Sequence, residues 1–298
     1  KNDRPWTEQP PAMNPAFTEK WFLRCKDLVD KYQPDLLYFD NIGELPLDKA
    51  GLDITAHYYN ASLKRHSGKL EAVANCKGLS KKRRNAVVED IERGVATDIL
   101  PEPWQTDTCI GSWHYSRDIA EKNKYKTVQY VIHLLIDVVS KNGNLLLSIP
   151  IRGDGTIDEH EVAFLEGMAK WMNINSEAIF NTRPWKVFGE GPTKVKTGMF
   201  SESETQPYTA RDIRFTRSKD DKILYAIVLV WPDDGKVIIR SLANSAGNVT
   251  GVSLLGHKKH LSWKQTENGL EIQFPPKAPC QFAYCLKVTG GPFTPAKQ

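Results

Sequence analysis

The sequence predicts an α/β fold in which a parallel β/α part is followed by a smaller antiparallel β-sandwich. Short apolar runs alternate with segments of helical spacing up to about residue 184. Beyond residue 209 the hydrophobic period falls to about two, and turn pairs such as Asp234-Gly235 separate the runs. We therefore assign residues 1–184 to the β/α part and residues 185–298 to the sandwich.

The β/α part is expected to begin with a polar, proline-rich loop over residues 1–14. Apolar residues at helical spacing predict helices over residues 16–31, 48–66, 125–140 and 158–173. Asp158 followed by Glu161 matches a capping box at the start of the last of these helices. Strands are expected over residues 36–40, 70–75, 85–91 and 144–149.

The second part consists of short runs with alternating apolar residues. Strands are predicted over residues 213–216, 222–231, 236–240, 269–274 and 282–288. Short strands separated by regular turns are typical of a β-sandwich.

Composition excludes several classes of function. The chain of 298 residues is 40% hydrophobic and 26% charged, and its net charge of +4 gives no argument for a nucleic-acid partner or an anionic membrane. No apolar run approaches the ~20 residues of a membrane helix. The five cysteines lack metal-ligand spacing, and no glycine-rich phosphate loop is present, so we expect no metal or organic cofactor. A Cys280–Cys285 bridge is left open.

The chain opens at Lys1 without an initiator methionine or a signal peptide, which indicates a processed or partly recorded chain. Glycosylation triplets begin at Asn60 and Asn248, and they matter only in a protein secreted by a eukaryote.

Asp40 is the leading candidate for a functional residue. The run from Leu36 to Phe39 is too short for a helix and predicts a buried strand, which ends in this carboxylate. In a parallel sheet or barrel, a residue at the carboxyl end of a strand faces the active site. Asp40 as the cap of the next helix is the alternative, and the spacing alone does not separate the two.

Three ordered segments resemble those of the family-29 glycoside hydrolases, the α-L-fucosidases. Residues 31–41 read KYQPDLLYFDN and resemble the motif that carries the catalytic nucleophile of this family. Residues 141–150, KNGNLLLSIP, followed by DGTI at 154–157, resemble a late barrel strand and turn. Residues 171–185, WMNINSEAIFNTRPW, resemble the last barrel helix and the exit into the next domain.

The resemblance implies a retaining exo-α-L-fucosidase with two catalytic carboxyl groups about 5–5.5 Å apart. Asp40 would be the nucleophile, and hydrogen-bond donors should surround it because it must stay ionised. Glu92 would be the acid/base, since Glu92-Arg93-Gly94 resembles the acid/base segment of one branch of the family. Glu89 and Glu102 are the alternatives. Another branch has its acid/base directly after a later tryptophan, where this chain has Gln105, which exchanges no proton at neutral pH.

Aromatic residues are expected to bind the apolar faces of fucose. Trp104, Trp113 and Tyr115 lie in a segment that resembles the family's pocket-lining strand and loop, and Tyr38 is two residues before Asp40. Lys77 stands where many relatives have a sugar-binding Arg. Each of these residues also has an ordinary structural interpretation, as core aromatic or solvated lysine.

The β/α part is too short for a complete barrel, which takes about 250 residues. The resemblance therefore assigns it to the C-terminal half of a (β/α)₈-like barrel, with the His-rich half missing upstream. We expect a fucosylated glycan as substrate and an N-terminal fragment that completes the barrel, in a secreted, periplasmic or lysosomal setting. A homo-oligomer is left open. A non-catalytic fucose-binding or structural relative, or a hydrolase of another sugar, is the alternative.

Overall fold

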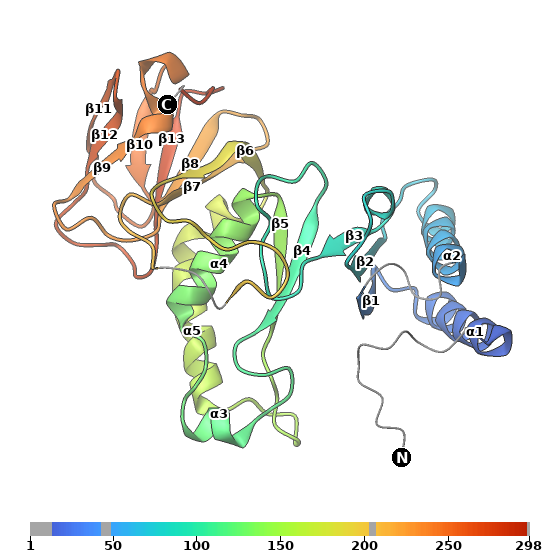
Figure 1. Cartoon of the computed structure of the whole chain (residues 1–298). Coiled ribbons are helices and arrows are strands. Elements are labelled where there is room, and N and C mark those ends of the chain that lie inside the picture. Colours follow the sequence, from blue (N-terminus) through green and yellow to red (C-terminus); the bar gives the residue numbers. More distant parts are fainter. Residues whose placement is uncertain (1–13, 43–48, 203–206, 297–298) are drawn as a thin grey trace. The chain divides into compact units, whose positions relative to one another are not determined.

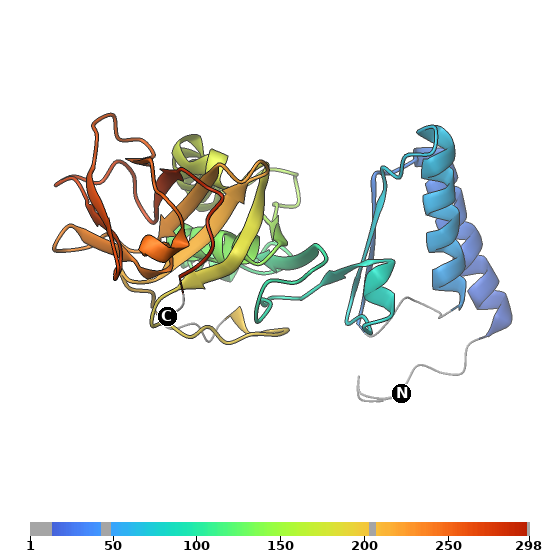
Figure 2. The same ribbon diagram turned by 90° about the horizontal axis from the view of Figure 1, so that it is seen from above.

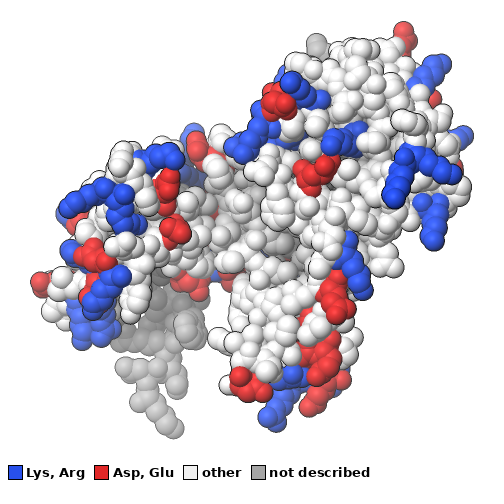
Figure 3. Space-filling model, turned by 180° about the vertical axis from the view of Figure 1, so that it is seen from behind, with Lys and Arg blue, Asp and Glu red and all other residues white. Residues whose placement is uncertain are grey.

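The computed structural model describes residues 14–42, 49–202 and 207–296, and the chain divides into two compact units, residues 1–90 and 91–298. The predicted fold class is confirmed: parallel strands with helices come first, and antiparallel sheets follow (Figure 1). No described helix has the length and apolarity to span a bilayer. Basic and acidic side chains are interspersed on the face drawn in Figure 3.

The first unit is a parallel sheet covered on one face by two helices (Figure 2). Its elements are α1 (Pro15–Tyr32), β1 (Leu36–Ile42), α2 (Lys49–Arg65), β2 (Val73–Lys77), η1 (Arg83–Asn85) and β3 (Val88–Asp90). Asn14 caps α1 by accepting a hydrogen bond from the backbone N of Ala16. Phe39 and Cys76 pack with Ile54 and Tyr58 of α2 in the core of this unit, so the helices fix which face of the sheet is buried.

The second unit begins with further β/α elements. These are β4 (Trp104–Cys109), α3 (Arg117–Glu121), α4 (Val128–Ser140), β5 (Gly143–Ser148), α5 (Glu159–Asn175) and η2 (Ser176–Ala178). β4 and β5 pair in parallel from Trp104 and Gly143 onward. The capping box predicted at the start of α5 is confirmed, because Asp158 accepts from the backbone N of Glu161 and Glu161 accepts from that of Asp158.

The sandwich consists of two antiparallel sheets with strand orders β10-β13-β8-β7-β6 and β11-β12-β9. The strands are β6 (Thr182–Glu190), β7 (Ile213–Ser218), β8 (Ile223–Val228), β9 (Lys236–Ile239), β10 (Gly251–Leu254), β11 (Ser262–Thr266), β12 (Gly269–Gln273) and β13 (Tyr284–Thr289). Short 3₁₀ turns, η4 (Arg240–Leu242) and η5 (Asn244–Ala246), follow β9.

Strand β8 is buried on both faces. Leu224 and Ala226 point into the sandwich core, whereas Tyr225 and Ile227 pack against residues of α4 and α5 such as Ile136. The last barrel helices and the sandwich therefore share a core within the second unit. The division into domains at residue 184 stays a prediction.

Some predicted elements need correction. The strand expected over residues 70–75 is Val73–Lys77, and the one expected over 85–91 is Val88–Asp90, because residues 85–87 belong to the 3₁₀ turn η1 and the turn that follows it. The predicted helices agree with α1, α2, α4 and α5 to within three residues at their described ends. Most of the loop predicted over residues 1–14 lies outside the described residues. Cys280 and Cys285 are both free thiols.

A buried group of charges joins α4 to the sandwich. Asp137 accepts hydrogen bonds from Lys141 Nζ and Arg214 Nε, both at 2.7 Å, and all three side chains are buried. Burial alone would raise the pKa of Asp137, but the charges of Lys141 and Arg214 outweigh it and lower that pKa. The aspartate therefore neutralises two buried cations, Lys141 and Arg214.

We predict that Asp137→Asn lowers the free energy of unfolding by about 3–5 kcal/mol, because it leaves two buried cations without a counter-charge. Denaturant unfolding followed by circular dichroism measures this loss. The matched control is Asp118→Asn, because Asp118 pairs with Lys122 on an exposed surface of α3. It should leave the unfolding midpoint almost unchanged. Equal midpoints for the two variants would contradict a stabilising role for the buried group.

Candidate functional site

Asp40 lies near the carboxyl end of β1, at an irregularity of the strand. Phe39 pairs with Cys76 of β2, but the next pair joins Ile42 to Lys77, so a bulge falls at Asp40 and its neighbour. A bulge bends a strand and redirects its side chains, and bulges are frequent next to active sites. The Asp40 side chain is 73% exposed, so the carboxylate at this strand end is open to solvent.

The pleat of β1 separates a packing face from a functional face. Phe39 is buried and its ring lies 5.9 Å from that of Trp21 in α1. Neighbouring side chains in a strand point to opposite faces, so Tyr38 and Asp40 lie on the face of the sheet away from the helices. Tyr38 and Asp40 therefore share one face of β1.

Lys77, at the end of β2, contacts Asp40 directly. Its Nζ donates a hydrogen bond of 2.7 Å to Asp40 Oδ1 and lies 5.8 Å from the centre of the Tyr38 ring. The Lys77 side chain is only 3% exposed. Because a buried ammonium is costly without a negative partner, the Asp40 carboxylate is held at this position. The structure thus brings Asp40, Lys77 and Tyr38 together.

Glu92 belongs to the second unit, directly after the chain leaves β3. The backbone N of Ile91 donates to Gln105 O at 2.8 Å and that of Arg93 to Asp107 O at 2.9 Å, so the segment runs beside β4. Glu92 itself is half-buried. Glu92 and Arg93 form a turn between these two hydrogen bonds, and Arg93 has a left-handed φ angle of 46°.

The two alternative acid/base residues lie in less suitable places. Glu89 sits opposite Cys76 in the sheet and forms an ion pair of 2.7 Å with Arg84, on the face that packs against helices. Burial raises the pKa of Glu89, and Arg84 opposes that rise. Glu102 is exposed before Trp104, at the amino end of β4, whereas catalytic side chains of parallel barrels gather at the carboxyl ends.

The predicted aromatic contacts divide into two groups. Trp104 is 1% exposed, packs in a cluster with Val138, and donates from Nε1 to Lys141 O at 2.8 Å, so this ring has a packing role in place of the predicted substrate contact. Trp113 is 39% exposed and Tyr115 half-buried in the loop after β4. Both remain available at the carboxyl end of that strand.

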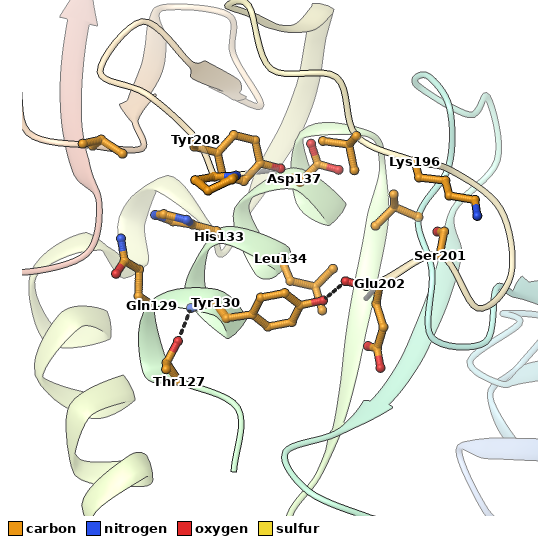
Figure 4. A pocket seen from close by; sticks show the side chains of 14 residues that line it. Thr127, Gln129, Tyr130, His133, Leu134, Asp137, Lys196, Ser201, Glu202 and Tyr208 are labelled. Carbon is orange, nitrogen blue, oxygen red and sulfur yellow. Dashed lines mark hydrogen bonds between the residues drawn. The ribbon is translucent and has the colours of Figure 1, made fainter. Parts of the chain in front are cut away.

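A buried polar cluster that the sequence did not reveal is centred on Glu202. Its carboxylate accepts hydrogen bonds from Arg93 Nε at 2.6 Å, Lys126 Nζ at 2.8 Å and Thr108 Oγ1 at 2.6 Å. Tyr130 donates to the backbone O of Glu202 (Figure 4). No local pattern points to this cluster, because Arg93 and Glu202 are 109 residues apart.

A cavity of about 320 Å³ lies beside this cluster, between α4, residues 195–202 and residues 207–208 (Figure 4). His133 and Tyr208 form part of its wall, and none of the predicted site residues does. Within the described ranges, no group of His, Cys, Asp and Glu has the arrangement of a metal site.

Two family models match the chain. The model described as "Alpha-L-fucosidase" matches residues 2–177, and the model "Alpha-L-fucosidase C-terminal domain" matches residues 206–289. The match of the second model to the region of the antiparallel sheets agrees with the observed change of architecture.

Curated relatives and solved structures give the same result. Plasma alpha-L-fucosidase of Rattus norvegicus is 30% identical over 275 residues, which cover 88% of this chain and 54% of the relative. Tissue alpha-L-fucosidase of Homo sapiens is 31% identical over 291 residues, covering 92% and 57%. The crystal structure of Thermotoga maritima alpha-fucosidase with a mechanism-based inhibitor is 27% identical, with a TM-score of 0.69, covering 93% and 57%. The chain thus spans about half the length of these relatives.

The Glu202 cluster predicts a specific loss of stability in acid. Burial alone would raise the pKa of Glu202, but hydrogen bonds from Lys126, Thr108 and Arg93 outweigh it and lower the pKa. A lowered pKa stabilises the fold above the unfolded value of about 4.3, and this contribution disappears as the pH falls through the folded-state pKa.

In Glu202→Gln this contribution is absent, because the amide does not titrate. We therefore expect the free energy of unfolding to fall less steeply below pH ~4.3 in the variant than in the wild type. Urea titrations at a series of acidic pH values measure both slopes. Identical slopes would contradict the lowered pKa of Glu202.

Proposed function

Because this chain belongs to the alpha-L-fucosidase family, we propose that the protein is a retaining exo-α-L-fucosidase that releases terminal α-L-fucose from glycans. The observation that carries this proposal is the position of Asp40. Its carboxylate projects at a bulge near the carboxyl end of a parallel strand and is held by the buried ammonium of Lys77 at 2.7 Å. A negatively charged, solvent-open oxygen in a fixed place is what a glycosidase nucleophile requires.

In the first step Asp40 attacks the anomeric carbon of fucose through a carboxylate oxygen. The bond from that carbon to the glycosidic oxygen breaks, and Glu92 donates its proton to the departing oxygen. This step forms an ester between fucose and Asp40. The Lys77 ammonium stabilises the charge on Asp40 before the attack and orients its Oδ1, and Oδ2 is the oxygen that we assign to the attack.

In the second step the Glu92 carboxylate accepts a proton from water. The oxygen of this water attacks the anomeric carbon, and the ester bond to Asp40 breaks. Two successive displacements at the same carbon retain the configuration of the sugar. The half-buried position of Glu92 after β3, compared with the ion-paired Glu89 and the exposed Glu102, favours it for this role.

Solved structures of relatives support this assignment. Structures of the Thermotoga maritima enzyme, 27% identical to this chain, hold fucose in one case and a mechanism-based inhibitor in another. By analogy, we assign Tyr38, Trp113 and Tyr115 to the contacts with the apolar faces of the sugar. We assign Lys77 an indirect role: it orients the carboxylate of Asp40, whereas its sequence position led us to expect a direct contact with the sugar.

The setting of the protein is also part of the proposal. The chain spans about half the length of its relatives, and so we propose that a segment equivalent to their other half completes the barrel, in the same polypeptide or in a partner. The names of the plasma and tissue relatives favour a secreted or lysosomal location. The sandwich, from about residue 185, would be a separate domain that packs on the last barrel helices.

Asp40→Gly is expected to lower hydrolysis by about 10⁴-fold or more, because it removes the group that forms the covalent intermediate. The space left by the side chain allows azide to attack the anomeric carbon of an activated fucoside directly. Added azide should therefore restore turnover and give β-L-fucosyl azide, which nuclear magnetic resonance identifies. Asp35→Gly, at the amino end of the same strand, is the control and should keep its activity. Full activity of the Asp40 variant would disprove the assignment.

Glu92→Gln is expected to act selectively on substrates whose leaving group needs a proton. Hydrolysis of a fucosylated oligosaccharide should fall by about 10²–10⁴-fold, because a sugar alkoxide departs poorly without general-acid catalysis. Attack on 2,4-dinitrophenyl α-L-fucoside should be far less affected, and azide should yield α-L-fucosyl azide. Glu102→Gln is the matched control. If Glu92→Gln leaves oligosaccharide hydrolysis unchanged, Glu92 is not the acid/base.

A further inference from the structure

The chain between β6 and β7 returns to the segment that carries Glu92. We call residues 198–202 the return segment. Three backbone hydrogen bonds join it to residues 92–95: Gly198 N to Val95 O at 2.8 Å, Phe200 N to Glu92 O at 2.8 Å and Glu202 N to Arg93 O at 3.0 Å. Since the other edge of residues 91–93 pairs with β4, the Glu92 segment is held from both sides.

Arg93 occupies a backbone conformation that is uncommon for its residue type. Its φ angle is 46°, in the left-handed region that favours glycine. Such a conformation persists only where surrounding contacts stabilise it, and it is frequent at functional sites. Here the contacts are the backbone bonds on both sides and the ion pair of 2.6 Å between Arg93 Nε and Glu202 Oε1.

The close approach of the return segment also explains why residue 94 is a glycine. A Cβ built on Gly94 would lie 1.8 Å from the backbone O of Gly198 and 3.1 Å from Ser201 Oγ. Any side chain at residue 94 would therefore push the return segment away. In the Glu92-Arg93-Gly94 sequence, Glu92 is the proposed acid/base and Arg93 binds Glu202 of the return segment. Gly94 leaves the space that the return segment occupies.

Glu202, the partner of Arg93, is buried and accepts several hydrogen bonds. The Glu202 side chain is 4% exposed and also contacts Lys126 Nζ and Thr108 Oγ1, which places it against the carboxyl end of β4. Arg93 and Lys126 give the site two cations for one carboxylate. Loss of the Glu202 charge would leave these cations near each other and release the Arg93 side chain.

We propose that Glu202 is a positioning residue for the hydrolytic reaction: through Arg93 it fixes the backbone that directs the Glu92 carboxyl group. This inference rests on the proposed function, in which Glu92 is the acid/base. The inference gives a positioning role to Glu202, which lies between strands β6 and β7 of the sandwich. A displacement of about 1 Å at a catalytic group can cost about 10²-fold in rate, so the effect is measurable.

The test compares two substrates on the same preparation of the active protein. One is 2,4-dinitrophenyl α-L-fucoside, whose leaving group needs no proton, and the other is a fucosylated oligosaccharide, whose leaving group needs one. The ratio of their kcat/KM values does not depend on how much protein is folded. Glu202→Gln should lower the oligosaccharide value by about 10–10²-fold relative to the dinitrophenyl value. The alkaline limb of the oligosaccharide pH profile should also move.

Two further variants make the result specific. Gly94→Ala displaces the return segment without altering a charge and should change the ratio in the same direction. Glu177→Gln is the matched control, since Glu177 forms a surface ion pair of 3.1 Å with Lys287, and it should leave the ratio unchanged.

The outcomes separate this inference from the proposed function. If Glu92→Gln changes the ratio and both Glu202→Gln and Gly94→Ala leave it at the wild-type value, Glu202 has only a structural role and the inference is wrong. If Glu92→Gln itself leaves the ratio unchanged, the acid/base assignment fails, and the positioning role fails with it.

Discussion

The ion pair between Lys77 and Asp40 is the interaction on which the proposed site depends. An ammonium that is 3% exposed needs a negative partner, and here the partner is a carboxylate that is 73% exposed. The pair thus connects the interior of the first unit to its functional face. It forms only because β1 and β2 are aligned by the packing of Phe39 and Cys76 against the helices, and because the bulge falls at Asp40. Helix packing, strand register and the position of the proposed nucleophile are therefore one connected set of constraints.

The second unit uses buried charge in a similar way. Asp137 joins α4 to Arg214 of β7, and Glu202 joins the return segment to Arg93 and Lys126. In each case a carboxylate neutralises cations from segments far apart in the sequence, and a buried carboxylate paired in this manner restricts those segments to one arrangement. These ion pairs thereby join the sandwich and its connections to α4 and to the segment that carries Glu92.

The sequence was sufficient for features set by local patterns. The presence of a strand from Leu36, the four long helices and the capping box at Asp158 follow from hydrophobic spacing and local hydrogen bonding, although the strand continues past Asp40 to Ile42. Features set by tertiary contact were missed. Lys77 and Asp40 are 37 residues apart, and the bulge that brings them together leaves no trace in composition. Trp104 looked like a sugar-binding ring, but Gly143 leaves space for it to pack inside. Strand β6 was missed because Pro184 and Gly189 interrupt its pattern, and its pairing with β7 shifts register between them.

The proposed mechanism requires a covalent bond between Asp40 and fucose, and this bond can be trapped. A 2-deoxy-2-fluoro-α-L-fucosyl fluoride carries a good leaving group, while the fluorine at C2 slows breakdown of the intermediate. Incubation of the active protein with this reagent, proteolysis and tandem mass spectrometry locate the ester. If Asp40 is the nucleophile, a single fluorofucosyl group is expected on the peptide that contains residues 36–42, attached to Asp40. A label on another carboxylate, or turnover of ordinary fucosides with no labelled peptide, would contradict it.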